Sequence, residues 1–170
     1  MEELDDSRIT AIHETGHIVM GFFALGSMPR SVSIVPGSTE RGSVGGLEAG
    51  GATKRDVLIL LAGFVAVDIL TGYEDDSGCE DDFQDAFNIL AQLDAENDFN
   101  RLLSMVYKFL SYKRARMAVR VGADYLLEHP QLEGEAVYPL LDLLEKTMGR
   151  RFVRTHQERV RLATFAEGRG

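Results

Sequence analysis

Apolar side chains recur at helical spacing near the start of the chain, and this pattern predicts a helix from about residue 7 to 25. Its apolar stripe consists of Ile9, Ile12, Gly16, Val19, Met20 and Phe23. The side chain of Asp5, Asp6 or Ser7 can cap the start of this helix by accepting a free backbone N–H group. Turn-forming residues at positions 26–29 end it.

The pattern then changes over positions 31–35, where polar and apolar residues alternate from Ser31 to Ile34, and this is typical of a half-buried strand. Pro36 and Gly37 predict a turn, and the glycine-rich segment 42–51 predicts a loop with a second short strand. That segment lacks the glycine and lysine spacing of a phosphate-binding loop, so the sequence does not indicate a nucleotide site.

Residues 53–67 predict a helix at the centre of the fold. Thr53 and Asp56 have the spacing of a capping box, and the run 57–67 is apolar nearly all round, as in a buried helix. Two later segments, 102–110 and 137–148, have amphipathic patterns and predict further helices. The basic residues around position 113 fit a solvated helix face.

Length and composition limit the possible classes of protein. The chain has 170 residues, which suits one domain, and we expect it to cover residues 1–150, followed by a basic tail at 151–170 that frays. The longest apolar run, 57–67, is too short to span a bilayer, so no transmembrane segment is expected. One cysteine and no secretion signal favour a cytoplasmic location.

Charge is distributed unevenly along the chain. The net charge is −9; residues 1–100 contain 19 acidic and 5 basic residues, whereas residues 101–170 contain 8 acidic and 13 basic residues. Excess carboxylates in the first part favour cations and disfavour nucleic acid. No aromatic residues alternate with the basic ones in the second part as a nucleic-acid surface would require, so no nucleic-acid partner is expected.

The first predicted helix contains the sequence HETGH, an instance of the zinc-peptidase motif HExxH. His13 and His17 are four residues apart and share one helix face, so both imidazoles can bind one Zn²⁺ ion. Glu14 is then placed to act as the general base that takes a proton from a zinc-bound water during peptide hydrolysis. The alternative is a chance pair of surface histidines.

Gly16, within the same motif, weakens a helix, and a close approach by another element would explain why a glycine is present there.

A catalytic zinc site usually has three protein ligands, and the motif supplies two. His129 precedes a proline at a helix end and His156 lies in the arginine-rich tail, so a carboxylate from the acidic stretch 74–85 is the better candidate. Chemistry alone does not distinguish between four carboxylates and a softer rival ligand, Cys79. The four carboxylates belong to Glu80, Asp81, Asp82 and Asp85. Asp68, at the end of the apolar helix, either reaches the surface or hydrogen bonds to a metal ligand.

Several of these stretches resemble the peptidase domain of the FtsH-type ATP-dependent zinc proteases. Residues 11–17 are similar to that family's A-x-HEAGH, and residues 31–46 to its V-x-I-x-P strand with a glycine-bearing return. Residues 61–68 resemble its LGGRxAEE, and residues 77–82 its TGAxND. The resemblance implies a mainly α fold with a small β-sheet beside the HExxH helix. It also implies that His13, His17 and Asp82 bind zinc and that Glu14 is the base.

The chain also departs from the family pattern. Phe64 and Val67 stand where the family has an arginine and a glutamate, and Asp68 replaces its second glutamate. The ATPase and membrane helices that precede the peptidase in that family are missing from this sequence. The expected substrates are therefore peptides or unfolded proteins, including proteins delivered by a separate AAA-type unfoldase, and analogy suggests a homo-oligomer.

The main functional prediction is a zinc-dependent metalloendopeptidase. We expect the exposed sheet edge formed by Val32, Ser33, Ile34 and Val35 to bind the substrate as an added strand above the zinc. One alternative is a catalytically inactive, peptidase-like binding or regulatory module. Another is a closed structural zinc site, which would have four protein ligands and no exchangeable water.

Overall fold

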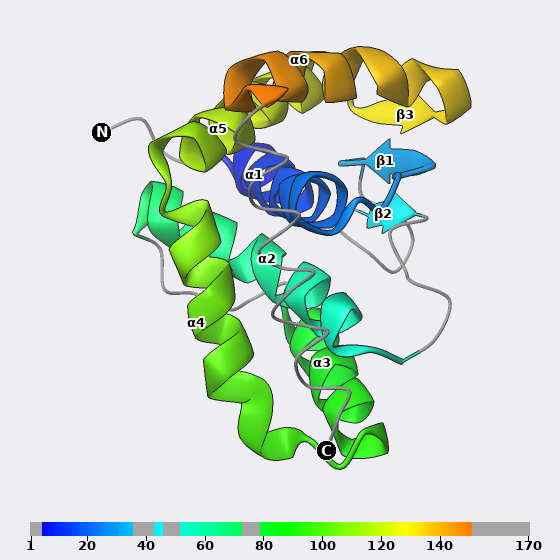
Figure 1. Cartoon of the computed structure of the whole chain (residues 1–170). Coiled ribbons are helices and arrows are strands. Elements are labelled where there is room, and N and C mark those ends of the chain that lie inside the picture. The colour runs from blue at the N-terminus through cyan, green and yellow to red at the C-terminus, as the bar shows by residue number, and fades with distance from the viewer. Residues whose placement is uncertain (1–4, 36–42, 46–51, 73–78, 151–170) are drawn as a thin grey trace.

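The computed structural model describes residues 5–35, 43–45, 52–72 and 79–150, and in these ranges the protein is mainly helical with a small antiparallel sheet (Figure 1). The α-helices are α1 (Asp6–Ile18), α2 (Lys54–Thr71), α3 (Glu80–Gln92), α4 (Phe99–Leu110), α5 (Lys113–Glu128) and α6 (Tyr138–Met148). A π-helical segment, η1 (Val19–Ala24), continues α1, and two short 3-10 helices, η2 (Glu96–Asp98) and η3 (Gly134–Val137), precede α4 and α6. The strands are β1 (Ser31–Ser33), β2 (Ser43–Gly45) and β3 (Gln131–Glu133).

The first helix forms where the apolar stripe predicts it. Asp5 is the N-cap, and its side chain accepts a hydrogen bond from the Ser7 backbone N–H at 2.8 Å. The helical path then runs without a break from α1 through η1 to Ala24, close to the predicted end at residue 25. Most residues from Ala11 onward are buried, so this helix lies inside the fold.

Helix α1 lies between α2 and α5 (Figure 1), and two glycines permit the close packing. A Cβ atom on Gly16 would lie 2.6 Å from both the Ala62 carbonyl oxygen and the Ala66 Cβ atom of α2. On α5, a Cβ atom on Gly122 would lie 2.5 Å from the Thr15 Cγ2 atom. Such distances are shorter than van der Waals contact, so the close approach expected for Gly16 is confirmed.

Helix α2 is the central helix of the core, as its apolar sequence predicts. The predicted capping box is present: the Thr53 side chain accepts from the Asp56 N–H, and the Asp56 carboxylate accepts from the Thr53 N–H at 3.0 Å. Helices α1, α3 and α4 all pack against α2. Its fully buried side chains include Val57, Leu61, Ala62 and Val65.

The later helices complete the core around α1 and α2. Helix α4 buries Leu102, Val106, Phe109 and Leu110, and α6 buries Leu140, Leu141, Leu144 and Met148. Helix α6 packs on α5, where the Arg114 guanidinium donates a hydrogen bond to the Met148 carbonyl at 3.0 Å. These amphipathic helices agree with the sequence prediction, and the basic residues of α5 are exposed.

The sheet has the order β2-β1-β3, with both pairs antiparallel. Val32 of β1 therefore pairs with Val44 on one side and with Leu132 on the other. Beyond β1, the Ile34 N–H donates to the Pro130 carbonyl at 2.8 Å, and Val35 is exposed.

The prediction of a free strand edge at Val32, Ser33, Ile34 and Val35 is therefore wrong. β1 is the middle strand, because the three-residue strand β3 pairs with the edge of β1 that was expected to be free. β2 and β3 are the outer strands of the described sheet, and β2 packs against α1. The ladder also ends at Ser33, two residues earlier than expected.

Some predictions concern residues outside the described ranges. These are the basic tail 151–170, the turn at Pro36 and Gly37, most of the glycine-rich segment and the acidic residues 74–77. None of the helices in the described part of the chain is long and apolar enough to cross a membrane.

Candidate metal centre

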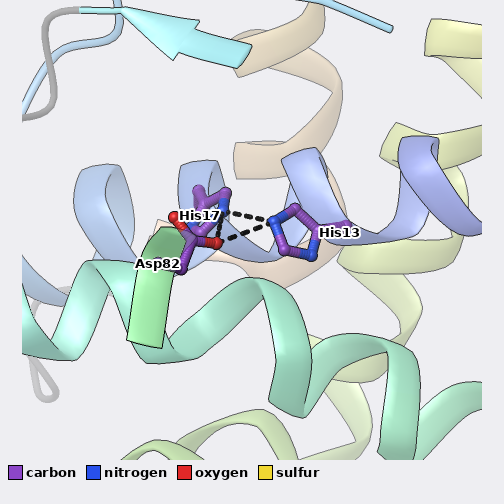
Figure 2. A group of neighbouring side chains, drawn as sticks. All are labelled: His13, His17 and Asp82. Atoms are coloured by element: carbon purple, nitrogen blue, oxygen red, sulfur yellow. Dashed lines mark hydrogen bonds and ion pairs between the residues drawn. The ribbon is translucent and has the colours of Figure 1, made fainter. Parts of the chain in front are cut away.

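His13 and His17 lie one turn apart on α1, and their side chains turn toward each other (Figure 2). Their Nε2 atoms are 2.8 Å apart, and the two rings meet edge to face with centroids 4.5 Å apart. Both side chains are largely shielded from solvent. The HExxH spacing therefore places two imidazole nitrogens at one point on the helix.

Asp82 of α3 completes the cluster. Its Oδ2 atom lies 3.0 Å from His13 Nε2 and 3.3 Å from His17 Nε2 (Figure 2). Within the described residues, these three side chains form the single group of histidine, cysteine or acidic residues that could hold a metal ion. The neighbouring candidates Glu80, Asp81 and Asp85 are exposed. The geometry thus favours the carboxylate that the family resemblance implies.

Helix α3 is held in place by apolar packing against α2. The Phe83 ring contacts the Phe64 ring of α2 edge to face, with centroids 5.1 Å apart. Ala86 and Leu90, further along α3, are fully buried. Phe64 therefore supports the helix that supplies Asp82.

The ring of His17 is oriented by a backbone carbonyl. His17 Nδ1 lies 2.7 Å from the Ile59 carbonyl oxygen of α2, in a buried position. An Nδ1–H group donating to this oxygen directs Nε2 toward Asp82 and His13. Metal-binding histidines commonly have such a support for the second ring nitrogen, because it fixes both the tautomer and the orientation.

The ring of His13 is supported differently. It lies directly against α2 at Gly63, where a Cβ atom would come within 2.5–2.7 Å of three ring atoms. His13 Nδ1 is 3.6 Å from the Sγ atom of Cys79, the N-cap residue of α3. The thiol therefore lies at Nδ1, whereas Asp82 lies at Nε2. Cys79 is not in the group of possible ligands, despite its prediction as a rival.

The two histidines differ in their proton affinity. Burial lowers the pKa of His13, and the charge of His17 lowers it further. Burial acts in the same direction on His17, but the hydrogen bond and charge of Asp82 outweigh it. With the Glu14 carboxylate and the Ile59 carbonyl adding to this effect, the pKa of His17 is raised to about 9. Although burial opposes ionisation of Asp82, hydrogen bonds from both histidines hold its pKa well below the usual range.

The donor set fits zinc. Two imidazole nitrogens and one carboxylate oxygen are common ligands of catalytic zinc, at distances of about 2.0–2.2 Å. A tetrahedral arrangement would separate such ligand atoms by about 3.3 Å. The observed separations of 2.8, 3.0 and 3.3 Å are close to this value, so side-chain movements of a few tenths of an ångström would suffice.

Glu14 and Asp68 differ in their relation to the cluster. Glu14 is buried on α1, with 4 % of its surface exposed, and its charge acts on His17. Glu14 therefore lies close enough to His17 for its charge to act on that ring. Asp68 instead accepts a hydrogen bond from the Tyr107 hydroxyl of α4 at 2.5 Å. Asp68 therefore links α2 to α4, and the structure does not bring it to His13 or His17.

Three contacts that support the cluster were not predicted from the sequence. They are the Ile59 carbonyl at His17, the packing of the His13 ring against Gly63, and the contact of Cys79 with His13. A backbone carbonyl carries no side-chain signal, so Ile59 could not have been found. Gly63 could have been identified as a close-packing site, because a glycine inside an apolar helix often marks close packing.

No model of a known protein family matches this sequence, and no curated protein was found to match it.

Proposed function

We propose that the protein is a zinc metallopeptidase with a centre of the FtsH peptidase type. The proposal rests on the convergence of His13 Nε2, His17 Nε2 and Asp82 Oδ2. Glu14, the residue after His13, is buried, and its charge acts on His17. Two imidazoles from HExxH and a carboxylate from another helix are a donor set suited to catalysis. The likeness to the FtsH family is part of the proposal and is supported by this ligand arrangement.

A catalytic centre accounts for the cluster better than a closed structural one. Three ligand atoms converge in the described residues, which would leave a fourth coordination position for water or substrate. A bound zinc ion would supply a Lewis acid that polarises the peptide carbonyl and acidifies water. The chain's own groups then have distinct tasks: His13, His17 and Asp82 hold the ion, and Glu14 accepts and returns the proton.

Substrate would bind along β2 rather than β1. β2 is an outer strand of the described sheet and packs against α1, so an extended peptide added there would lie near the cluster. Main-chain hydrogen bonds to a strand edge depend little on side-chain identity. This mode suits peptides and unfolded proteins, which can become extended.

The proposal is tested by cleavage of casein, an unfolded protein, with zinc-loaded protein, a chelator-treated sample and the Glu14→Gln variant. We expect turnover by the zinc-loaded protein and none after chelation. Glu14→Gln should lower turnover by about 10²–10⁴-fold while the zinc content stays the same, because the amide cannot accept a proton. A Glu135→Gln variant is the matched control, since Glu135 is exposed and lies in η3.

The same experiment identifies the alternatives. A zinc-occupied protein that binds casein without cleaving it would be a peptidase-like binding module. Turnover that survives in Glu14→Gln would show that another group is the base.

A further inference from the structure

The first turn of α3 contacts both ring nitrogens of His13. Asp82 Oδ2 lies 3.0 Å from Nε2, and Cys79 Sγ lies 3.6 Å from Nδ1. The two residues are three positions apart, at the N-cap and in the first turn of the helix. Docking of this turn and orientation of the His13 ring therefore depend on the same contacts.

We propose that Cys79 is a positioning residue for His13, whose Nδ1–H group donates a hydrogen bond to the Cys79 sulfur. The inference rests on the proposed zinc site. A histidine that binds zinc through Nε2 carries its proton on Nδ1, and that N–H needs an acceptor in a buried site. Sulfur is a weak acceptor, and the distance of 3.6 Å is within the range for a hydrogen bond to sulfur.

Burial and packing favour this role over that of a reactive or ligating thiol. Cys79 is only 6 % exposed, so its sulfur is enclosed where it meets the ring. One side of the ring is blocked by α2 at Gly63, which limits how His13 can turn. Cys79 could become a ligand only by moving from Nδ1 to the side of the ring where Nε2, His17 and Asp82 meet.

The two histidines therefore have unlike acceptors. His17 donates to a backbone carbonyl of α2 at 2.7 Å, which no side-chain substitution removes. The acceptor for His13 Nδ1 is one side chain from a different helix, that of Cys79. Of the two acceptors, the one at His13 can be removed by mutation, so the proposal can be tested at a single position.

The test measures zinc affinity by competition with a chromophoric chelator, using the 170-residue chain. Cys79→Ala should weaken zinc binding about tenfold, the lower end of the range for loss of a group that supports a metal ligand, because sulfur is a weak acceptor. Cys79→Ser should recover part of this loss, since its hydroxyl can accept the same bond. Gln84→Ala, an exposed position on the same helix, should bind zinc like the wild type.

Two further measurements distinguish positioning from other roles. In nitrogen-15 NMR spectra of the zinc-loaded protein, the His13 Nδ1 proton should be protected in the wild type and exchange faster in Cys79→Ala. Cobalt(II)-substituted wild type should lack a thiolate-to-cobalt charge-transfer band. A band that is present in the wild type and absent in Cys79→Ala would show that Cys79 is a ligand, and would overturn the proposal. The proposal would also be overturned if Cys79→Ala changed neither the zinc affinity nor the exchange of the His13 Nδ1 proton.

Zinc affinity is measured independently of peptide cleavage, so the two proposals can fail separately. Weaker zinc binding by Cys79→Ala in a protein that cleaves nothing would support the positioning role and reject the peptidase. Cleavage of casein by the wild type, together with unchanged zinc affinity and proton exchange in Cys79→Ala, would support the peptidase and reject the positioning role. A wild type that does not bind zinc would reject both.

Discussion

The residues of the candidate metal centre come from two regions of very different character. His13 and His17 are on α1, which is buried between α2 and α5 and approaches α2 closely at Gly16. Asp82 is on α3, most of which is exposed and which packs mainly on α2. The side chain of Asp82 is 23 % exposed, against 9 % for His17. The histidine pair thus depends on the core, whereas the proposed third ligand depends on the docking of one peripheral helix.

This difference has an energetic consequence. Disturbing α1 should affect folding and metal binding together, because the same packing holds both. Disturbing the first turn of α3 should affect metal binding with little change in the fold. Zinc, once bound, would add to the attachment of α3, because a ligand that binds only the docked state stabilises that state.

The largest effect is expected from Gly16→Val. Its Cβ atom would lie 2.6 Å from the Ala62 carbonyl oxygen, a backbone atom that cannot move independently of α2. Overpacking of this kind should lower the free energy of unfolding by about 3 kcal/mol or more, and zinc affinity should fall with it. Urea unfolding of the metal-free protein measures the first quantity, and chelator competition measures the second.

Ser104→Val is the control for Gly16→Val, since it puts the same β-branched side chain at an exposed position of α4. It should cost less than about 1 kcal/mol. A Gly16→Val protein as stable as this control would mean that α1 and α2 can separate without loss of stability. The assignment of the histidine pair to the rigid core would then be wrong.

The next effect in size is expected from Asp82→Ala. If Asp82 is a direct ligand, as proposed, its loss should weaken zinc binding by more than the 10–100-fold typical of groups that only support a ligand. Far-ultraviolet circular dichroism of the metal-free variant should stay the same as that of the wild type, because Asp82 is at the edge of the fold. Asp85→Ala, exposed and one turn away on α3, should leave zinc affinity unchanged. Equal losses in the two variants would indicate a general effect of negative charge rather than ligation.

The same contrast explains how much of the site could be predicted from the sequence. The meeting of His13 and His17 could be predicted, because helical spacing alone brings residues four apart onto one face. The position of Asp82 depends on how α3 docks, through contacts such as Phe64 with Phe83, and residue spacing does not encode such contacts. Chemistry therefore left four carboxylates open, and a family resemblance was needed to choose among them.

The fold shows a similar division. The capping box at Thr53 and the apolar run of α2 predicted the central helix, because both are local signals. The place of β1 in the sheet was predicted wrongly, because it depends on β3. That strand has only three residues, too few for an alternating pattern to identify it. Which strand lies at an edge is a property of the sheet and not of the strand's own sequence.

The smallest effect concerns the pH dependence of the metal-free protein. The pKa of His17 rises from 6.5 to about 9 in the folded state, mainly because Asp82 outweighs the effect of burial. A raised pKa means that the stabilising contribution is complete below pH 6.5 and is lost as the pH rises through 9. The free energy of unfolding should therefore fall between about pH 7 and 9.5. The shift sets an upper limit of about 3 kcal/mol. Relaxation of the buried site should keep the measured loss well below this limit, and so below the losses expected from Gly16→Val and Asp82→Ala.

Asp82→Asn provides the control for this pH dependence. The neutral amide removes the charge that raises the pKa of His17, so the difference in stability between wild type and variant should shrink as the pH rises from 7 to 9.5. Because the pKa of His13 is lowered, its protonation changes the stability only below about pH 6.5, outside this pH range. A difference that stays constant with pH would show that Asp82 does not pair with a protonated His17. The link between the α3 carboxylate and the α1 histidines would then require the metal ion.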